Sequence, residues 1–386
     1  WTRFGRRIPY LFVGSLVAVL VMCLLPNAGS FGMAVSTAMI FGLVSLMFLD
    51  TSINMAMQPF KMMVGDMVNE KQKGLAYSIQ SFLCNAGSLV GFLFPFIFTW
   101  IGISNIAPQG VVPDSVIYSF YIGAAILILC VIYTTVKVKE MPPAEYAEYH
   151  GITEEEKKEK INMVKLLVKA PKAFWTVGLV QFFCWFAFMF MWTYTNGSVA
   201  ANVFDAPTVE TVVNGASKVV LDTKSIQYQN AADWVGVLFA VQAIGSVLWA
   251  VCIPMFKNRK LIYSLSLVLG GIGFISTYFV HNQYVLFISF LLIGCAWAAM
   301  LALPFTILTN ALSGGHMGTY LGLFNGTICI PQIVAATLGG SILALFTPKG
   351  MLPPEINMLV MAGVMLIIGA VCVYLIKETK GEQAKA

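Results

Sequence analysis

An aspartate inside an apolar stretch has the clearest chemical potential in this sequence. Asp50 lies within Phe48–Asn54 and is preceded by a long hydrophobic run. By insertion scales, an ionised carboxylate at the centre of a bilayer costs about 3 kcal/mol, and burial in general raises the pKa of a carboxyl group. We therefore expect Asp50 to gain and lose a proton and to couple proton movement to another process. The alternative is a buried aspartate whose oxygens are satisfied by neighbouring hydroxyl groups.

Polar residues follow Asp50 at helical spacing. Asn54, Gln58 and Lys61 come four, eight and eleven residues later, so a helix places all of them on one face. Such a stripe faces a cavity or a helix interface, and its donors and acceptors suit the binding of a sugar. Lys61 lies near the end of the run, where it either snorkels to the membrane surface or reaches back toward Asp50.

Other polar and aromatic side chains interrupt later apolar runs. The residues that we predict to line a wet, substrate-binding cavity are Gln80, Asn85, Gln181, Trp185, Asn325 and Gln332. Hydrogen bonding between helices explains any one of the amides equally well. Within the aromatic stretch 182–194, Trp185, Trp192 or Tyr194 could stack on a sugar ring. An aromatic belt at the membrane surface is the alternative, and the sequence slightly favours it for Trp192 and Tyr194.

The elements that position these residues are long apolar helices. The chain has 386 residues, of which 58% are hydrophobic and only 11% charged. A bilayer core requires about 20 apolar residues in a helix, and backbone groups in lipid must be paired internally. We predict ten spans, at roughly 9–26, 32–60, 74–101, 116–136, 173–198, 232–256, 260–280, 284–310, 317–346 and 356–376.

Basic residues indicate how these spans are oriented. If the N-terminus is cytoplasmic, 20 of the 23 Lys and Arg residues fall on the cytoplasmic side, and Lys218, Lys224 and Lys349 are the exceptions. This asymmetry follows the positive-inside rule. We therefore expect a multi-pass protein of the cell membrane with both termini in the cytoplasm.

The chain divides into two parts that resemble each other. A charged segment, 137–171, separates a bundle at 1–136 from a second bundle with a short tail at 172–386, and we interpret it as a cytoplasmic linker. Pro59-Phe60 before Gly74 matches Pro304-Phe305 before Gly318 at nearly the same spacing, which indicates that 32–101 and 284–346 are equivalent repeats. Internal repeats typify transporters. If each half has six helices, the first half lacks its first two.

Other chemistries find little support. Eight cysteines occur singly within the apolar runs, no two histidines have metal-ligand spacing, and no nucleotide-binding loop or catalytic triad appears. We expect a protein that is not an enzyme and has no metal or other cofactor. Its expected partners are a small sugar, a coupling proton and the lipid bilayer; nucleic acid is not among them, and the protein is expected to be monomeric.

Short motifs carry a resemblance to a known family. Arg3-Phe4-Gly5-Arg6-Arg7 resembles the end of the loop between helices two and three of the major facilitator superfamily. The continuation Arg6–Tyr10, then Leu49-Asp50, Pro59–Lys61 and Gly65-Asp66, resembles the plant sucrose carriers and their animal and bacterial relatives, which are similar to the glycoside-pentoside-hexuronide cation symporters. The resemblance implies an all-α major facilitator fold that here contains helices 3–6 and 7–12 of twelve.

The resemblance also implies roles for individual residues. Asp50 aligns with an aspartate associated with proton coupling, and Lys61 with a basic residue associated with sugar binding. Asp66 would pair with Arg3, Arg6 or Arg7 in a cytoplasmic gate. One departure concerns the second half, where Trp192–Thr195 replaces the tryptophan and Arg-Glu pair of the plant carriers, so the identity of the disaccharide is open.

These patterns together predict a secondary transporter. We expect proton-coupled symport of a disaccharide or α-glucoside, of the sucrose or maltose type, by alternating access across a bacterial inner membrane. The rivals are a sodium-coupled glycoside symporter, an exporter of drugs or metabolites, and a membrane sugar sensor that transports nothing. Sodium-coupled carriers usually need more than one membrane carboxylate, and Asp50 is the carboxylate that lies near the middle of an apolar stretch.

Overall fold

The structure is a computed structural model of the chain, and most of its length forms helices. It describes residues 5, 7–32, 35–67, 70–106, 111–140, 142, 145, 163–168, 170–213, 216–256, 258–311, 317–348 and 350–376. Within these residues ten helices are long and apolar enough to cross a membrane, and the predicted all-α fold is confirmed. The chain forms two compact units, residues 1–159 and 160–386, which divide inside the segment predicted as a linker.

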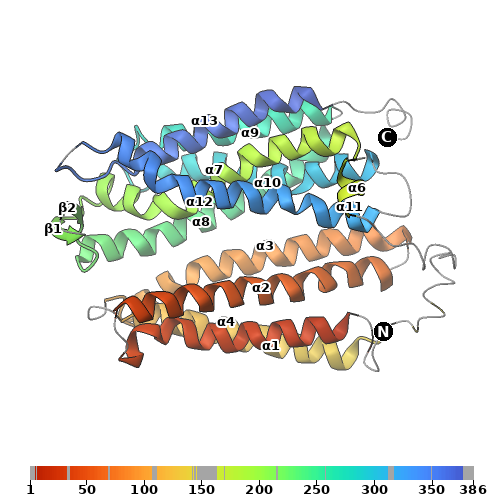
Figure 1. Ribbon diagram of the computed structural model, residues 1–386, viewed down its shortest axis with the longest axis horizontal. Helices are drawn as coiled ribbons and strands as arrows, with labels where there is room; N and C mark the ends of the chain where they lie inside the picture. Colours follow the sequence, from red (N-terminus) through yellow and green to blue (C-terminus); the bar gives the residue numbers. More distant parts are fainter. Residues whose placement is uncertain are drawn as a thin grey trace. The chain divides into compact units, whose positions relative to one another are not determined.

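The first unit is a bundle of four long helices (Figure 1). They are α1 (Ile8–Leu24), α2 (Val35–Met67), α3 (Glu70–Trp100) and α4 (Asp114–Lys137), with a 3₁₀ turn η1 (Leu25–Phe31) after α1. Helix α1 packs against both α2 and α4, and α3 packs against α4. A small residue allows α1 to approach α2, because a Cβ on Gly14 would lie 2.9 Å from the backbone oxygen of Ser52.

The second unit surrounds one central helix. Its helices are α6 (Met163–Val168), α7 (Lys172–Asn202), α8 (Ile226–Cys252), α9 (Arg259–Ser276), α10 (Leu286–Ala311), α11 (Met317–Phe324), α12 (Gly326–Phe346) and α13 (Ile356–Cys372), with 3₁₀ turns η2 (Ile253–Met255) and η3 (Val373–Leu375). Helix α7 contacts α8, α10, α12 and α13, so most of its side chains are buried. Helix α9 and helix α13 meet at facing glycines, since a Cβ on Gly363 would lie 2.7 Å from the carbonyl oxygen of Gly271.

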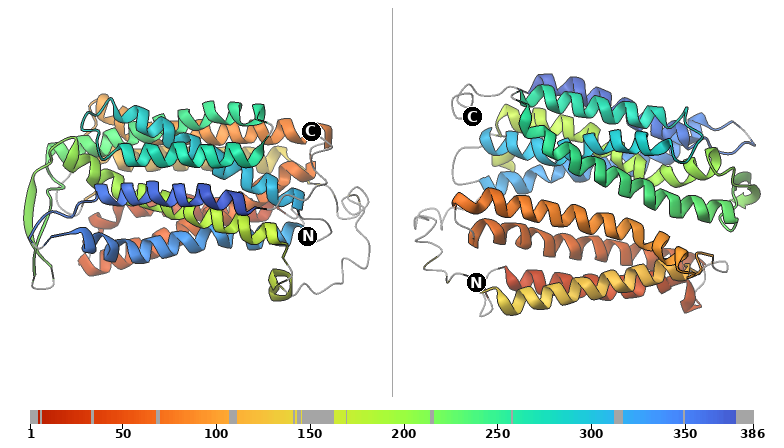
Figure 2. Two further views of the ribbon diagram at one scale, coloured as in Figure 1. Left: turned by 90° about the horizontal axis from the view of Figure 1, so that it is seen from above. Right: turned by 180° about the vertical axis from the view of Figure 1, so that it is seen from behind.

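Two features depart from the predicted elements. The predicted span 317–346 is two helices, α11 and α12, which meet at a turn at Asn325. A β-hairpin also follows α7, in a segment where no strand was predicted. It consists of the antiparallel strands β1 (Thr208–Val213) and β2 (Ala216–Leu221), and Figures 1 and 2 show it beyond the ends of α7 and α8. Its valines and threonines favour extended backbone over helix.

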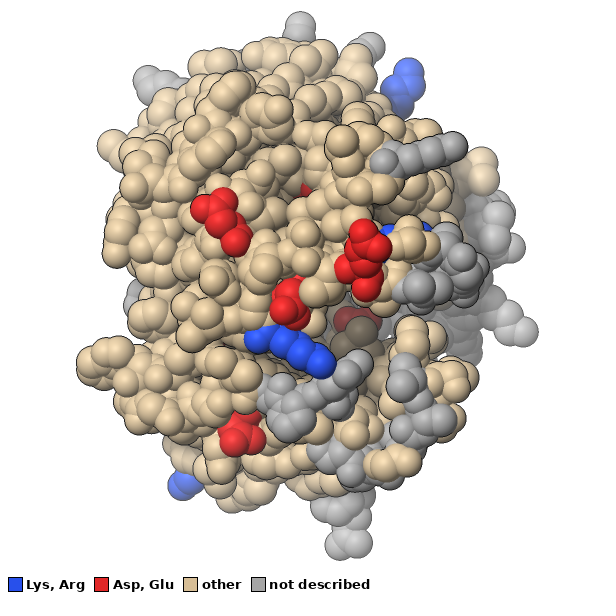
Figure 3. Space-filling view, turned by 90° about the vertical axis from the view of Figure 1, so that its left-hand side faces the viewer, with Lys and Arg blue, Asp and Glu red and all other residues tan. Residues whose placement is uncertain are grey.

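The outer faces of the helices are apolar. Leu248 and Val251 of α8 are 62% and 71% exposed, and similar side chains project from every long helix. In the end-on view of Figure 3, the charged side chains are few and scattered. Lipid is the solvent that such faces require, because a soluble protein rarely exposes apolar surface over whole helices.

Candidate functional site

Asp50 lies on the side of α2 that faces out of its own unit. Helix α2 contacts α1 through a stripe of buried residues that includes Ser52 and Ala56. At 100° per residue, Asp50 lies about 140° around the helix from this stripe, and its side chain is exposed. Its carboxylate is therefore not buried by the described residues of the first unit.

Asn54 is the described partner of Asp50. Its Nδ2 donates to the backbone oxygen of Asp50 at 2.9 Å and to the carboxylate Oδ1 at 3.2 Å. The predicted pairing of two polar residues on one helix face is thus present in the geometry of α2. In the described part of the chain no basic side chain forms an ion pair with Asp50. The side chains of Gln58 and Lys61 lie outside the described residues, so the rest of the predicted stripe stays a prediction.

Of the four residues predicted to form a cytoplasmic gate, the structure describes the side chain of Arg7 only. Arg3, Arg6 and the side chain of Asp66 lie outside the described residues. Arg7 is buried, and its backbone N–H donates to Oε1 of Glu140 at 2.7 Å, while that of Ile8 donates to the same oxygen at 2.6 Å.

Glu140 therefore caps the start of α1 from the segment that follows α4. A carboxylate at a helix N-terminus is stabilised by the free N–H groups and by the helix dipole. The sequence prediction did not include this residue. Glu140 lies three residues beyond α4, and its role as a cap becomes evident only from the contact between α1 and α4.

Two predicted cavity residues lie on α3 but do not share a face. Gln80 is half-buried, and its Nε2 is buried with no hydrogen-bond partner among the described residues. Asn85 is also half-buried. Five residues of helix separate them by about 140°, so they point in different directions. That either residue lines a substrate-binding cavity stays a prediction.

Gln181 of α7 donates a hydrogen bond to a carbonyl of α10 that a proline leaves without its helical donor. Pro304 lies inside α10 and has no N–H, so the carbonyl of Met300, four residues earlier, loses its helical donor. Gln181 of α7 supplies it, since its Nε2 donates to the Met300 oxygen at 3.0 Å. The side chain is 0% exposed, and its Oε1 accepts no hydrogen bond from any described residue. The Nε2 group of Gln181 thus links α7 to α10, and its Oε1 remains able to accept a hydrogen bond.

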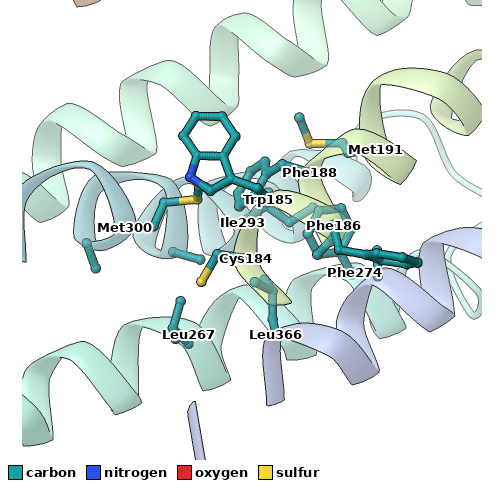
Figure 4. Close-up of a cluster of buried hydrophobic side chains, with 14 of the residues drawn as sticks. Cys184, Trp185, Phe186, Phe188, Met191, Leu267, Phe274, Ile293, Met300 and Leu366 are labelled. Carbon is teal, nitrogen blue, oxygen red and sulfur yellow. The ribbon is translucent and has the colours of Figure 1, made fainter. Parts of the chain in front are cut away.

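Trp185 lies one turn after Gln181 on the same face of α7. It is 8% exposed, and its Nε1 is buried without a partner in the described part of the chain. Its ring centroid lies 5.8 Å from that of Trp297 on α10 and 6.4 Å from that of Trp192. Figure 4 shows Trp185 inside the apolar cluster of the second unit, among side chains of α7, α9, α10 and α13. It is therefore a core residue that presents an unused donor, while Trp192 is 40% exposed.

The remaining predicted residues follow the turn between α11 and α12. Asn325 forms that turn, and its Nδ2 lies 3.9 Å from Sγ of Cys329. Gln332 comes seven residues later on nearly the same face of α12. Both amides are half-buried. They form a short polar stripe, with no described contact to Gln181 or Trp185.

A carboxylate that sequence reasoning missed lies at the start of α13. Glu355 immediately precedes the last span, and its side chain packs against Gly197 of α7. Burial raises the pKa of Glu355 from 4.5 to about 7. In the sequence this residue follows Pro353 and Pro354 and resembles a loop glutamate. Only the contact with α7 reveals that it is enclosed.

Ten apolar spans, with Gln181 hydrogen-bonded between two of them, define a multi-pass membrane protein. The sequence profile of the Major Facilitator Superfamily matches residues 1–220 and 204–386. Because the match covers the whole chain, the protein belongs to this superfamily. The resemblance that the sequence suggested is confirmed at this level, and the narrower resemblance to sucrose carriers stays a prediction.

Solved structures of transporters share the fold. A crystal structure of a D-xylose–proton symporter has a TM-score of 0.67 and 14% identity, and the match covers 99% of this chain and 83% of that one. The inward-open xylose transporter XylE from E. coli gives 0.63 and 13%, with 97% and 81% covered. The nucleoside transporter NupG gives 0.60 and 13%, with 97% and 85% covered. At such identities the likeness establishes the fold alone. Among curated proteins, none matches this chain in sequence.

Proposed function

We propose that this protein is a secondary active transporter that moves a disaccharide or α-glucoside together with protons. The observation that carries the proposal is Asp50, a carboxylate within a membrane span that faces out of its own unit and has no described basic partner. An ionised aspartate in contact with lipid costs several kcal/mol, so a water-filled pathway is the environment that suits it.

Protonation of Asp50 would change the free energy of the closed state and could thereby control transport. A neutral carboxyl can enter a closed, dry arrangement at far lower cost than an anion. Alternating access then follows if the carrier reorients readily only when Asp50 is protonated with sugar bound, or with both sites empty. Asn54, which donates to the Asp50 carboxylate, would hold that side chain in one orientation as its charge changes.

The second unit offers groups that suit a sugar. Gln181 Oε1 and Trp185 Nε1 are an acceptor and a donor, both buried without described partners, one turn apart on α7. Buried polar atoms rarely stay unpaired, and a hydroxyl group can satisfy both kinds. Trp185, Trp192 and Trp297 also present rings that suit the apolar face of a pyranose. The D-xylose–proton symporter of the same fold makes a sugar and a proton reasonable first tests.

The experiment uses the full-length protein in proteoliposomes and a panel of labelled sugars that includes sucrose and maltose. We expect uptake of at least one sugar against its gradient when the outside is acidic, with no need for sodium. Asp50→Asn should abolish uphill uptake and retain exchange of internal for external sugar. Asp114→Asn, at the first turn of α4, is the matched control and should behave like the wild type.

Each alternative has its own outcome. Uphill uptake that requires sodium at constant pH would indicate a sodium-coupled glycoside symporter instead. Sugar binding without any flux would indicate a sensor. Normal proton-driven accumulation by Asp50→Asn would refute the role assigned to this carboxylate, even if sugar transport itself is established.

A further inference from the structure

The side chain of Glu355 turns away from its own helix. Glu355 occupies the N-cap position of α13, where a side-chain oxygen ordinarily accepts a hydrogen bond from a first-turn N–H group, yet it makes no such bond. It crosses to α7 instead. A Cβ on Gly197 would lie 2.8 Å from Oε1 of Glu355 and closer still to Oε2. The carboxyl group therefore fills the space that any other residue at position 197 would need.

Among the described residues, no positive charge is paired with Glu355. Tyr194 of α7 and Tyr228 of α8 are the titratable groups within electrostatic reach. Helix α12 contributes Gly339, which packs on the Tyr194 hydroxyl and carries no charge. In the described part of the chain no Lys, Arg or His forms an ion pair with Glu355, and no donor forms a hydrogen bond to its oxygens.

In the described part of the chain, an anion at this position has neither a hydrogen-bond donor nor a cation as a partner. Glu355 accepts no hydrogen bond from the N–H groups of α13, the described residues offer it no cation, and its side chain is half-buried. Oδ1 of Asn196, the residue before Gly197, is also buried without a partner among the described residues.

From this geometry we propose that Glu355 is a proton-binding site of the second unit, protonated while the start of α13 packs on α7 and deprotonated when the two separate. The site would add a second proton-dependent step at the hairpin end of the transporter, besides Asp50. Its relevance to transport rests on the proposed function, but proton binding at Glu355 does not.

The direction of the pH effect follows from burial. The pKa of Glu355 is raised from 4.5 to about 7, so the packed arrangement holds the proton more tightly than the separated one. The contact is therefore most stable below about pH 4.5 and weakens as the pH rises through 7. With these two values, linkage gives about a tenfold rise in the ratio of separated to packed forms between pH 6 and pH 8.5.

Infrared difference spectra of the purified full-length protein test proton binding directly. We expect a carboxyl C=O signal that titrates with a midpoint of about 7 in the wild type. The signal should persist in Asp50→Asn and in the control Glu210→Gln, which changes an exposed hairpin residue, and it should be lost in Glu355→Gln. If Glu355→Gln loses no signal between about pH 5 and pH 9, the proposal is overturned.

Hydrogen exchange tests whether the proton controls the contact. After correction for intrinsic rates, we expect exchange in the first turns of α13 to rise about tenfold from pH 6 to pH 8.5 in the wild type and to stay constant in Glu355→Gln. Gly197→Ala should displace the carboxyl group and return the infrared midpoint toward 4.5. An unchanged midpoint in Gly197→Ala, or equal pH dependence in Glu355→Gln, would contradict the proposed contact. These measurements need no substrate, so absence of sugar transport would not affect them.

Discussion

The bond between Gln181 and Met300 predicts an energetic coupling between two helices that can be measured. Pro304 leaves the Met300 carbonyl without a helical donor, and Gln181 Nε2 replaces that donor at 3.0 Å. Gln181→Leu should therefore be costly when residue 304 is proline. It should cost less in the Pro304→Ala background, where the new N–H group can bond to the Met300 carbonyl within α10.

The expected coupling is about 1 kcal/mol. Leaving a buried carbonyl unpaired costs about 1–3 kcal/mol, and measured hydrogen bonds between membrane helices average about 0.6 with a maximum near 1.7 kcal/mol. Gln181→Leu also removes the unpaired Oε1 and adds apolar surface, which is favourable. Those two contributions are the same in both backgrounds, so the double-mutant cycle cancels them.

Reversible unfolding in mixed detergent micelles gives the four free energies that the cycle needs. Pro331→Ala in α12 is the matched control background, because that proline frees the carbonyl of Thr327, which no described bond links to Gln181. Gln181→Leu should cost the same there as in the wild type. Equal costs of Gln181→Leu in the wild type and in the Pro304→Ala background would refute the assigned pairing.

Three further changes probe other contacts. Glu140→Ala removes the acceptor of two backbone N–H groups at the start of α1 and should lower the free energy of unfolding by about 1–2 kcal/mol, whereas an unchanged value would contradict the cap. Gly363→Ala places a methyl 2.7 Å from the Gly271 carbonyl and should cost about 1–3 kcal/mol in thermal unfolding. Gly340→Ala, which meets open space, should be nearly neutral, and equal effects would argue against close packing of α9 and α13. Because burial raises the pKa of Glu355 from 4.5 to about 7, keeping it in place should cost at most about 3 kcal/mol above pH 7 and nothing below pH 4.5. Glu355→Gln should remove that part of the pH dependence of unfolding, and an identical pH profile would contradict it.

The long helices were predictable because lipid imposes one requirement on every span. Each span must pair its own backbone and present apolar side chains, so hydropathy alone locates α1 to α4, α7 to α10, α12 and α13. The Asp50–Asn54 pairing was equally accessible, since a four-residue separation on a helix is a local property. The turn at Asn325 was not, because the apolar run continues through it without a break.

The contacts that the sequence did not reveal are tertiary. Glu140 lies in a charged segment that the sequence predicts to be a solvated linker. Two N–H donors reach it only because α1 lies close to α4. Glu355 follows two prolines as a loop residue would, and its burial depends on a glycine 158 positions earlier. Gln181 was predicted to line a cavity, but the spacing from Pro304 to Met300 explains half of its hydrogen bonding.

The proposed coupling of sugar to a proton at Asp50 can be tested by counting protons as sugar moves. The most direct measurement is the internal pH of proteoliposomes, followed with a trapped dye. A transported sugar is added outside while the pH is initially equal on both sides of the membrane. The account predicts that sugar entry acidifies the interior of wild-type and Asp114→Asn vesicles. In Asp50→Asn vesicles preloaded with the same sugar, internal and external sugar should exchange without any change of internal pH. Sugar entry that leaves the wild-type interior at constant pH, or acidification that persists in Asp50→Asn, would contradict it.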